Sequence, residues 1–272
     1  MSTETIAKEY FELGKDFHYK QRNYHLANEY YLKAIELNPN CENALYACAQ
    51  NLRLNIKDYK EAIKYYSRVL ELQPNQQYAL FQRGICKGYL ENYTGQIQDY
   101  SKVIDLEPNP ADYISRALIK KKINDHVGVI IDCTHAISLE SEYLPAFQYR
   151  GEARMALSDY KGAVDDLEIA IALEEEASKK RGDNRPITFG TLKHCGIAKA
   201  LINDVHGALE VFQKLIAHHP DHPLPYKLSA KAKEKLGDME GYSEDMSKFK
   251  SINDKLVLKA GVSFDNTDTV WS

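Results

Sequence analysis

Small and large apolar residues recur along this chain at a spacing of about 34 residues, which indicates internal repeats. The clearest markers are the phrases AIELNP, VLELQP and VIDLEP, which end at Pro39, Pro74 and Pro108. Aligning the rest of the chain at this period predicts seven units. Their ranges are 7–41, 42–76, 77–109, 110–143, 144–177, 189–222 and 223–256.

The residue at the eighth position of every unit is small. Large residues follow at the position equivalent to Tyr31 in most units, four residues after a position that is often alanine. Small residues at fixed places let two helices approach closely, and the large ones fill the layer between neighbours. The small residues are Gly14, Ala49, Gly84, Ala117, Gly151, Gly196 and Ala230.

These positions resemble the tetratricopeptide repeat family, whose unit is a 34-residue helix–turn–helix. The match covers most of the chain and is clearest in the fifth unit. The matching residues there are Phe147, Arg150, Gly151, Tyr160, Ala163, Leu167 and Ala170. The resemblance implies an all-α, right-handed superhelical solenoid of about seven units and fourteen helices, continuous and single-domain.

Three segments fall outside the repeats. Residues 1–6 form a predicted N-terminal arm, and residues 257–272 form a polar tail that we expect to be extended or disordered. Residues 178–188 are an insertion, which we interpret as a tolerated surface loop. Within it, Gly182 and Pro186 should break the helix that precedes it.

Composition and charge narrow the function classes. The formal net charge of −4 argues against a strongly basic nucleic-acid binder, and the Lys120–Lys122 and Lys179–Arg181 runs read as solvated helix surface. No apolar run is long enough to span a bilayer, so membrane insertion is not expected. Five cysteines without a CxxC pair predict reduced thiols and a cytoplasmic, reducing compartment.

No catalytic constellation stands out. The sequence contains no glycine-rich phosphate loop and no serine in a nucleophile elbow. His218, His219 and His222 cluster in one phrase, but they fall at a predicted turn where polar residues are expected. We therefore expect a protein that is not an enzyme and that has no cofactor, no metal site and no nucleic-acid partner.

In the resembling family, the first helix of each unit lines a concave surface with its positions 2, 5, 9 and 12. In units two to four these positions are rich in aromatic and aliphatic residues, with basic residues around them. Exposed apolar rows usually mark a binding site. The candidate partner-binding residues are Phe11, Lys15, Tyr46, Arg53, Tyr78, Phe81, Ile85, Ile114, Leu118 and Lys121.

Three interpretations of this row stay open. The residues could pack on one another, they could bind a peptide or amphipathic helix, or the chain's own tail with Phe264 and Trp271 could cover them. The sequence favours the second, a non-catalytic adaptor or scaffold with a protein partner of unknown identity. We expect Phe81 and Leu118 to lie outside the layers between repeats.

The family also includes co-chaperones, which hold the acidic C-termini of the heat-shock chaperones Hsp70 and Hsp90 with a clamp of two lysines, two asparagines and one arginine. This chain lacks that set. The equivalent positions of the first three units are Phe11, Lys15, Ala47, Tyr78 and Gln82. Clamp binding is therefore disfavoured, and a co-chaperone without the standard clamp remains the alternative.

Overall fold

The computed structural model describes residues 2–183, 185–260 and 262–264, and the regular structure in these residues is helical. The helices follow one another in pairs, as the repeats predict. They are α1 (Thr3–Tyr19), α2 (Tyr24–Leu37), α3 (Glu42–Asn51), the π-helical turn η1 (Leu52–Ile56), α4 (Tyr59–Leu72), α5 (Gln77–Tyr89), α6 (Tyr93–Leu106), α7 (Pro110–Lys122), α8 (His126–Leu139), α9 (Leu144–Ala156), α10 (Tyr160–Arg181), α11 (Phe189–Leu201), α12 (Val205–His218), α13 (Pro223–Lys235) and α14 (Met239–Ala260).

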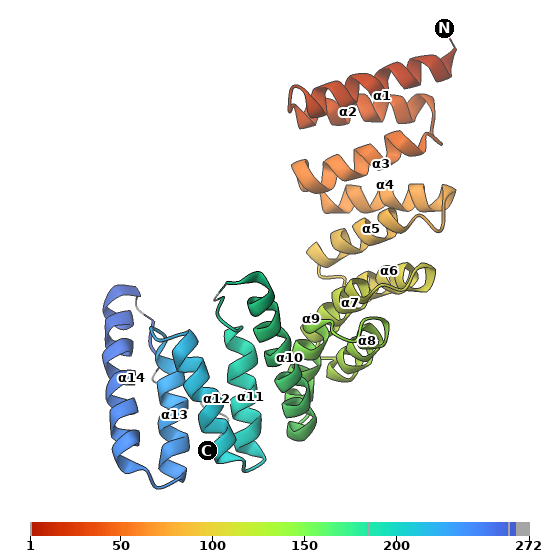
Figure 1. The fold of residues 1–272 in the computed structure, drawn as a ribbon. Helices are drawn as coiled ribbons and strands as arrows, with labels where there is room; N and C mark the ends of the chain where they lie inside the picture. The colour runs from red at the N-terminus through yellow and green to blue at the C-terminus, as the bar shows by residue number, and fades with distance from the viewer. Residues whose placement is uncertain (1, 184, 261, 265–272) are drawn as a thin grey trace. The chain divides into compact units, whose positions relative to one another are not determined.

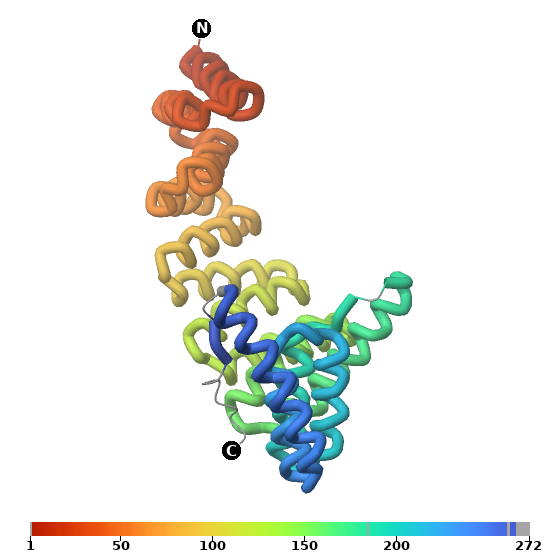
Figure 2. The backbone as a smooth tube through the Cα atoms, turned by 90° about the vertical axis from the view of Figure 1, so that its left-hand side faces the viewer, coloured from red at the N-terminus to blue at the C-terminus, as the bar shows by residue number. Residues whose placement is uncertain are grey.

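The chain divides into two compact units, residues 1–123 and 124–272. In the first unit, α1 to α7 stack in chain order and each helix packs on the next (Figures 1 and 2). In the second unit, α8 to α14 do the same (Figure 1). The boundary lies between α7 and α8, the two helices of the fourth repeat. Within each unit the packing between neighbouring helix pairs is that of a solenoid.

The small residue at the eighth position packs directly against the large residue of its own repeat's second helix. A Cβ atom added at Gly196 would lie 2.3 Å from the Phe212 ring, so no larger side chain fits without movement. The predicted small–large pairing is confirmed. The four glycine pairs are Gly14 with Tyr31, Gly84 with Tyr100, Gly151 with Leu167 and Gly196 with Phe212.

The turn between the two helices of a repeat has one construction in all seven repeats. One residue adopts a left-handed backbone with φ between 54° and 78°, and the next is Asn or Asp. The Asn or Asp side chain accepts a hydrogen bond from a backbone N–H of the second helix's first turn, which caps that helix. The turn residues are Arg22–Asn23, Lys57–Asp58, Glu91–Asn92, Asn124–Asp125, Ser158–Asp159, Asn203–Asp204 and Gly237–Asp238.

Buried ion pairs connect neighbouring helices. Arg83 on α5 donates two hydrogen bonds to Asp99 on α6, at 2.6 and 3.0 Å, and a third to Ser67 on α4 at 3.1 Å. Lys87 adds a second cation 2.8 Å from the same carboxylate. The second unit repeats the arrangement with Arg150, Asp166 and Thr134. Each arginine thus links its own repeat to the preceding helix.

Segments outside the predicted repeats are partly helical. Helix α1 already begins at Thr3, and α14 continues to Ala260. In the insertion, residues 178–181 extend α10 up to Gly182, which breaks the helix as predicted. The side chain of Ile187 is only 3% exposed and belongs to the core of the second unit. The C-terminal end of the insertion is therefore packed through Ile187, because an apolar side chain gains stability by leaving water, while residues 179–182 are exposed.

Candidate binding groove

The ten candidate partner-binding residues all lie in the first unit, on α1, α3, η1, α5 and α7. Their exposure differs widely. Tyr78 is 71% exposed and Leu118 39% exposed, whereas Ile114 is only 7% exposed. Ile114 is therefore a core residue of the unit and is not available to contact a partner.

The aromatic candidates rest on large residues of the second helices. Phe81 stacks on Tyr100 with ring centroids 4.9 Å apart and planes nearly parallel. Tyr46 meets the buried Tyr66 edge-to-face at 5.8 Å. Phe81 also packs against the core cluster of the unit. Phe81 is therefore partly buried and packs on the second helix of its own repeat, and the expectation that it lies outside the layers between repeats stays a prediction.

The two candidates on α1 are Phe11 and Lys15, and neither makes the same contacts as the candidates on α3 and α5. Phe11 packs on Tyr31 with centroids 5.9 Å apart, and the Lys15 ammonium lies 5.4 Å from the Phe11 ring centroid. Lys15 is also paired with Glu12 at 2.9 Å. Because this cation already has a carboxylate partner, α1 offers less unneutralised charge than the sequence suggests.

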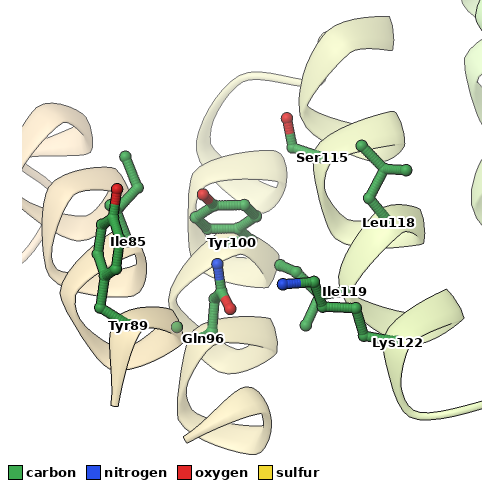
Figure 3. Close-up of a pocket in the computed structure, with 9 residues that line it drawn as sticks. Ile85, Tyr89, Gln96, Tyr100, Ser115, Leu118, Ile119 and Lys122 are labelled. Carbon is green, nitrogen blue, oxygen red and sulfur yellow. The ribbon is translucent and has the colours of Figure 1, made fainter. Parts of the chain in front are cut away.

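A cleft of about 430 Å³ opens between α5, α6 and α7, and we call it the groove cleft. Ile85 and Tyr89 form one wall, Tyr100 lies at the back, and Leu118 faces them from α7 (Figure 3). Its full lining is Ile85, Gly88, Tyr89, Gln96, Tyr100, Ser115, Leu118, Ile119 and Lys122. The lining is mainly apolar, with Lys122 at the rim, so the cleft suits an apolar side chain.

Two of the ten candidates, Ile85 and Leu118, line the groove cleft. Four of the other lining residues escaped prediction for two reasons. Tyr100 and Gln96 belong to a second helix, and the sequence argument considered only first helices. Tyr89 and Lys122 sit at position 13 of their repeats, one place beyond the last position considered.

Phe264 is held inside the second unit. Its ring lies 4.9 Å from that of His222, and its backbone N–H donates to Asn253 Oδ1 at 2.8 Å. Lys227 donates to its carbonyl at 3.3 Å. Phe264 is thus bound to α13 and α14, while Trp271, the other tail residue considered, lies outside the described residues.

The four buried thiols are unsuited to nucleophilic chemistry. Burial raises the pKa of Cys48 and Cys195 to about 12 and that of Cys86 to about 11, so each is a neutral thiol near pH 7. Cys133 is also fully buried. Among the described residues, no group of three or more His, Cys, Asp or Glu side chains is arranged to hold a metal ion.

No helix within the described part of the chain is both long and apolar enough to cross a membrane.

Residues 16–86 match the model of the family described as tetratricopeptide repeat. A comparison with curated proteins gives no match. Several solved structures share the fold. The C-terminal part of a TPR repeat-containing protein from Cytophaga hutchinsonii is 17% identical, with a TM-score of 0.62 over 79% of this chain and 81% of that one.

Two further structures are similar to the same degree. YrrB, described as a TPR protein with an unusual peptide-binding site, is 18% identical with a TM-score of 0.57, covering 75% of this chain and 97% of its own. MamA is 19% identical with a TM-score of 0.57, covering 64% and 94%. At these identities the likeness concerns the fold. Residues 16–86 thus match the tetratricopeptide repeat model, and the helix pairs of the described chain share the fold of solved tetratricopeptide repeat structures.

Proposed function

We propose that the first unit is a non-catalytic peptide-binding module and that it serves as an adaptor or scaffold. A segment of a partner protein would lie across α3, α5 and α7 and place an apolar side chain in the groove cleft. The observation that carries this proposal is the apolar cleft itself, which the 39% exposed Leu118 lines, with Tyr78 71% exposed on the same helix as the cleft residue Ile85. Apolar anchors in such pockets dominate the affinity of peptide complexes.

The likeness to YrrB supports this choice of surface, because that protein is described as having a peptide-binding site. The buried thiols support a binding role over a catalytic one, since a neutral buried thiol is a poor nucleophile.

A random-peptide phage library panned on the full chain provides probes for this proposal. Binding of the enriched peptides is then measured by fluorescence anisotropy with a Tyr78→Ala/Leu118→Ala variant. We expect a loss of about thirtyfold or more in affinity, because an exposed aromatic residue and a cleft wall are both removed. Circular dichroism should show unchanged helix content, since both residues are exposed.

The matched control is Leu72→Ala/Leu106→Ala. Both leucines are 40% exposed, close to the value for Leu118, but neither lines the groove cleft. We expect this variant to bind as the unmodified chain does. Equal losses in the two variants, or no loss in either, would move the binding surface away from the groove cleft.

A further inference from the structure

Arg53 belongs to the same compact unit as the groove cleft, and it makes no ion pair with a carboxylate among the described residues. It sits in the π-helical turn η1, which continues α3, and its side chain is half-buried. Its Nε atom is covered from solvent and has no hydrogen-bond partner among the described residues. Three other arginines of the chain, at positions 83, 150 and 154, by contrast bind buried carboxylates.

Residues of three helices, α3, α4 and α5, surround the Arg53 side chain. Burial raises the pKa of the Tyr46 and Tyr66 hydroxyls and of the Cys86 thiol, and the Arg53 guanidinium opposes that rise in each. The guanidinium therefore lies between α3, α4 and α5. Tyr66 is fully buried, and the Arg53 side chain lies within reach of its hydroxyl, although neither the hydroxyl oxygen nor Arg53 Nε makes a hydrogen bond of good geometry among the described residues.

A buried polar atom without a partner is costly, so two neighbouring ones call for an explanation. The Arg53 Nε–H could donate to Tyr66 Oη after a small rotation of the guanidinium. Such a rotation would be stabilised by an anion that accepts hydrogen bonds from the outer Nη atoms. Carboxylates accept such paired hydrogen bonds in a planar geometry.

The local charge favours an acidic ligand. Helix α5 contains no Asp or Glu. The carboxylates of α3 and α7 are Glu42 and Asp112, both in the first turn of their helices, whereas Arg53 lies beyond the last turn of α3. Helix α4 carries Glu61, which is paired with Lys64 at 3.2 Å, and Glu71, which is exposed. Lys122, at the last turn of α7, places a second cation at the rim of the groove cleft.

The π-helical turn is itself unusual. The first and second repeats each have one residue more than the 34-residue unit, but η1 in the second is a five-residue π-helix, where the other first helices end as α-helices. Such insertions are rare and are found frequently at functional sites. Here the turn carries Arg53, whose buried Nε has no hydrogen-bond partner among the described residues.

Building on the proposed peptide-binding function, we propose that Arg53 binds a carboxylate of the partner peptide, with Tyr66 as a positioning residue behind it. The partner is an acidic segment whose apolar anchor fills the groove cleft.

The distance between Arg53 and the groove cleft sets how many residues separate the acidic residue of the peptide from its apolar anchor. Arg53 lies on the α3 side of α5, and the groove cleft lies on the α7 side. A helix with its side chains is about 10–12 Å wide. Extended residues span about 3.3–3.6 Å each. The acidic residue is therefore expected about three positions from the apolar anchor.

The first test compares peptides that the full chain and its Arg53→Gln variant enrich from a random-peptide phage library. We expect the unmodified chain to enrich an Asp or Glu about three positions from a large apolar residue. The variant should keep the apolar preference and lose the acidic one. An identical consensus from both proteins would overturn the proposal.

The second test is a double-mutant cycle on one enriched peptide. Replacing its acidic residue by the matching amide should weaken binding to the unmodified chain by about tenfold or more. The same replacement should have no effect on binding to Arg53→Gln. Equal losses with both proteins would show that the carboxylate is bound elsewhere. Arg53→Lys is the control that keeps the charge and removes the paired geometry, and it should show an intermediate loss.

Tyr66→Phe tests the positioning role. The hydroxyl makes no hydrogen bond of good geometry among the described residues, so its removal should leave the melting temperature unchanged or raised. Affinity for the acidic peptide should fall about threefold, while affinity for its amide version should not change. An equal loss for both peptides would indicate a merely structural effect and overturn the role of Tyr66.

The outcomes separate this inference from the function on which it rests. Peptides that need Leu118 but ignore Arg53 would leave the groove function intact and overturn the carboxylate subsite. Peptides that ignore both Leu118 and Tyr78 would overturn the groove function, and with it this inference.

Discussion

Glycine at the eighth position of a repeat is a packing requirement. At Gly151 an added Cβ would lie 2.7 Å from Leu167 Cγ on the facing helix, which is closer than carbon atoms approach. We expect Gly151→Leu to lower the free energy of unfolding by about 3 kcal/mol, because overpacking forces side chains and backbone to move. Urea denaturation followed by circular dichroism measures the change.

Gly190→Ala is the matched control for this substitution. Gly190 is also helical, but the nearest atom to its added Cβ is Glu152 Oε1 at 3.9 Å, an ordinary contact. Alanine there should be neutral or stabilising by up to about 1 kcal/mol. If Gly151→Leu and Gly190→Ala were equally stable, the small–large pairing would not limit packing.

The cysteines give a second prediction at the scale of single residues. Cys41 is only partly buried, whereas the other four thiols are buried, and burial raises the pKa of Cys48 and Cys195 to about 12. At pH 8 these buried thiols remain protonated and covered. We expect about one thiol of the native chain to react quickly with Ellman's reagent, and five in guanidinium chloride. Fast reaction of two or more thiols would contradict the buried placement.

At the scale of helices, the buried Asp99 connects α5 and α6. It neutralises both Arg83 and Lys87, each of which is less than one-fifth exposed. Asp99→Ala leaves both cations without a carboxylate, and removing one partner of a buried pair typically costs about 3–5 kcal/mol. Thermal and urea denaturation should show a loss in this range.

The control is Asp105→Ala on the same helix, where the aspartate is exposed. Its effect should stay within about 0.5 kcal/mol. Similar stabilities for the two variants would mean that the ion pair contributes little beyond the apolar packing of α5 on α6.

The helices and their pairing were predictable because each depends on residues that recur. Glycine or alanine at the eighth position and a large residue on the second helix appear in most repeats, and the structure pairs them as expected. The Arg–Asp contacts were also present in the sequence as a spacing of 16 residues, from Arg83 to Asp99 and from Arg150 to Asp166. That signal was not used, because it occurs in only some of the repeats.

The groove cleft was only partly predictable. Position rules for first helices find Ile85 and Leu118, but Tyr100 reaches the cleft from a second helix. Whether an apolar residue of the predicted row is exposed to solvent depends on which side chains pack around it in the folded chain. Tyr78 at position 2 and Ile114 at position 5 of their repeats were both assigned to the concave row, yet Ile114 is 7% and Tyr78 71% exposed. The π-helical turn at Arg53 has no sequence marker beyond one extra residue in the repeat.

At the scale of the whole chain, stability in a solenoid comes from each repeat and its contacts with the next. Helices α9 and α10 pack on α8 and α11, while α1 to α4 belong to the other compact unit. We therefore expect Gly151→Leu to raise hydrogen exchange in α8 to α11 and to leave α1 to α4 unchanged. Uniformly faster exchange along the whole chain would show that the molecule unfolds as one cooperative body.

Site-specific photocrosslinking tests the central claim, that partner peptides bind along the groove cleft. A benzophenone amino acid replaces one residue in each of four full-length proteins. Two of the positions are Leu118, which lines the groove cleft, and the exposed Tyr78 on α5. The other two are Leu72 and Leu106, which do not line the groove cleft. A peptide enriched from the random library is then added and the mixture is irradiated. We predict crosslinked peptide at positions 78 and 118 and none at positions 72 and 106. Crosslinking at 72 or 106 with none at 78 or 118 would contradict the account.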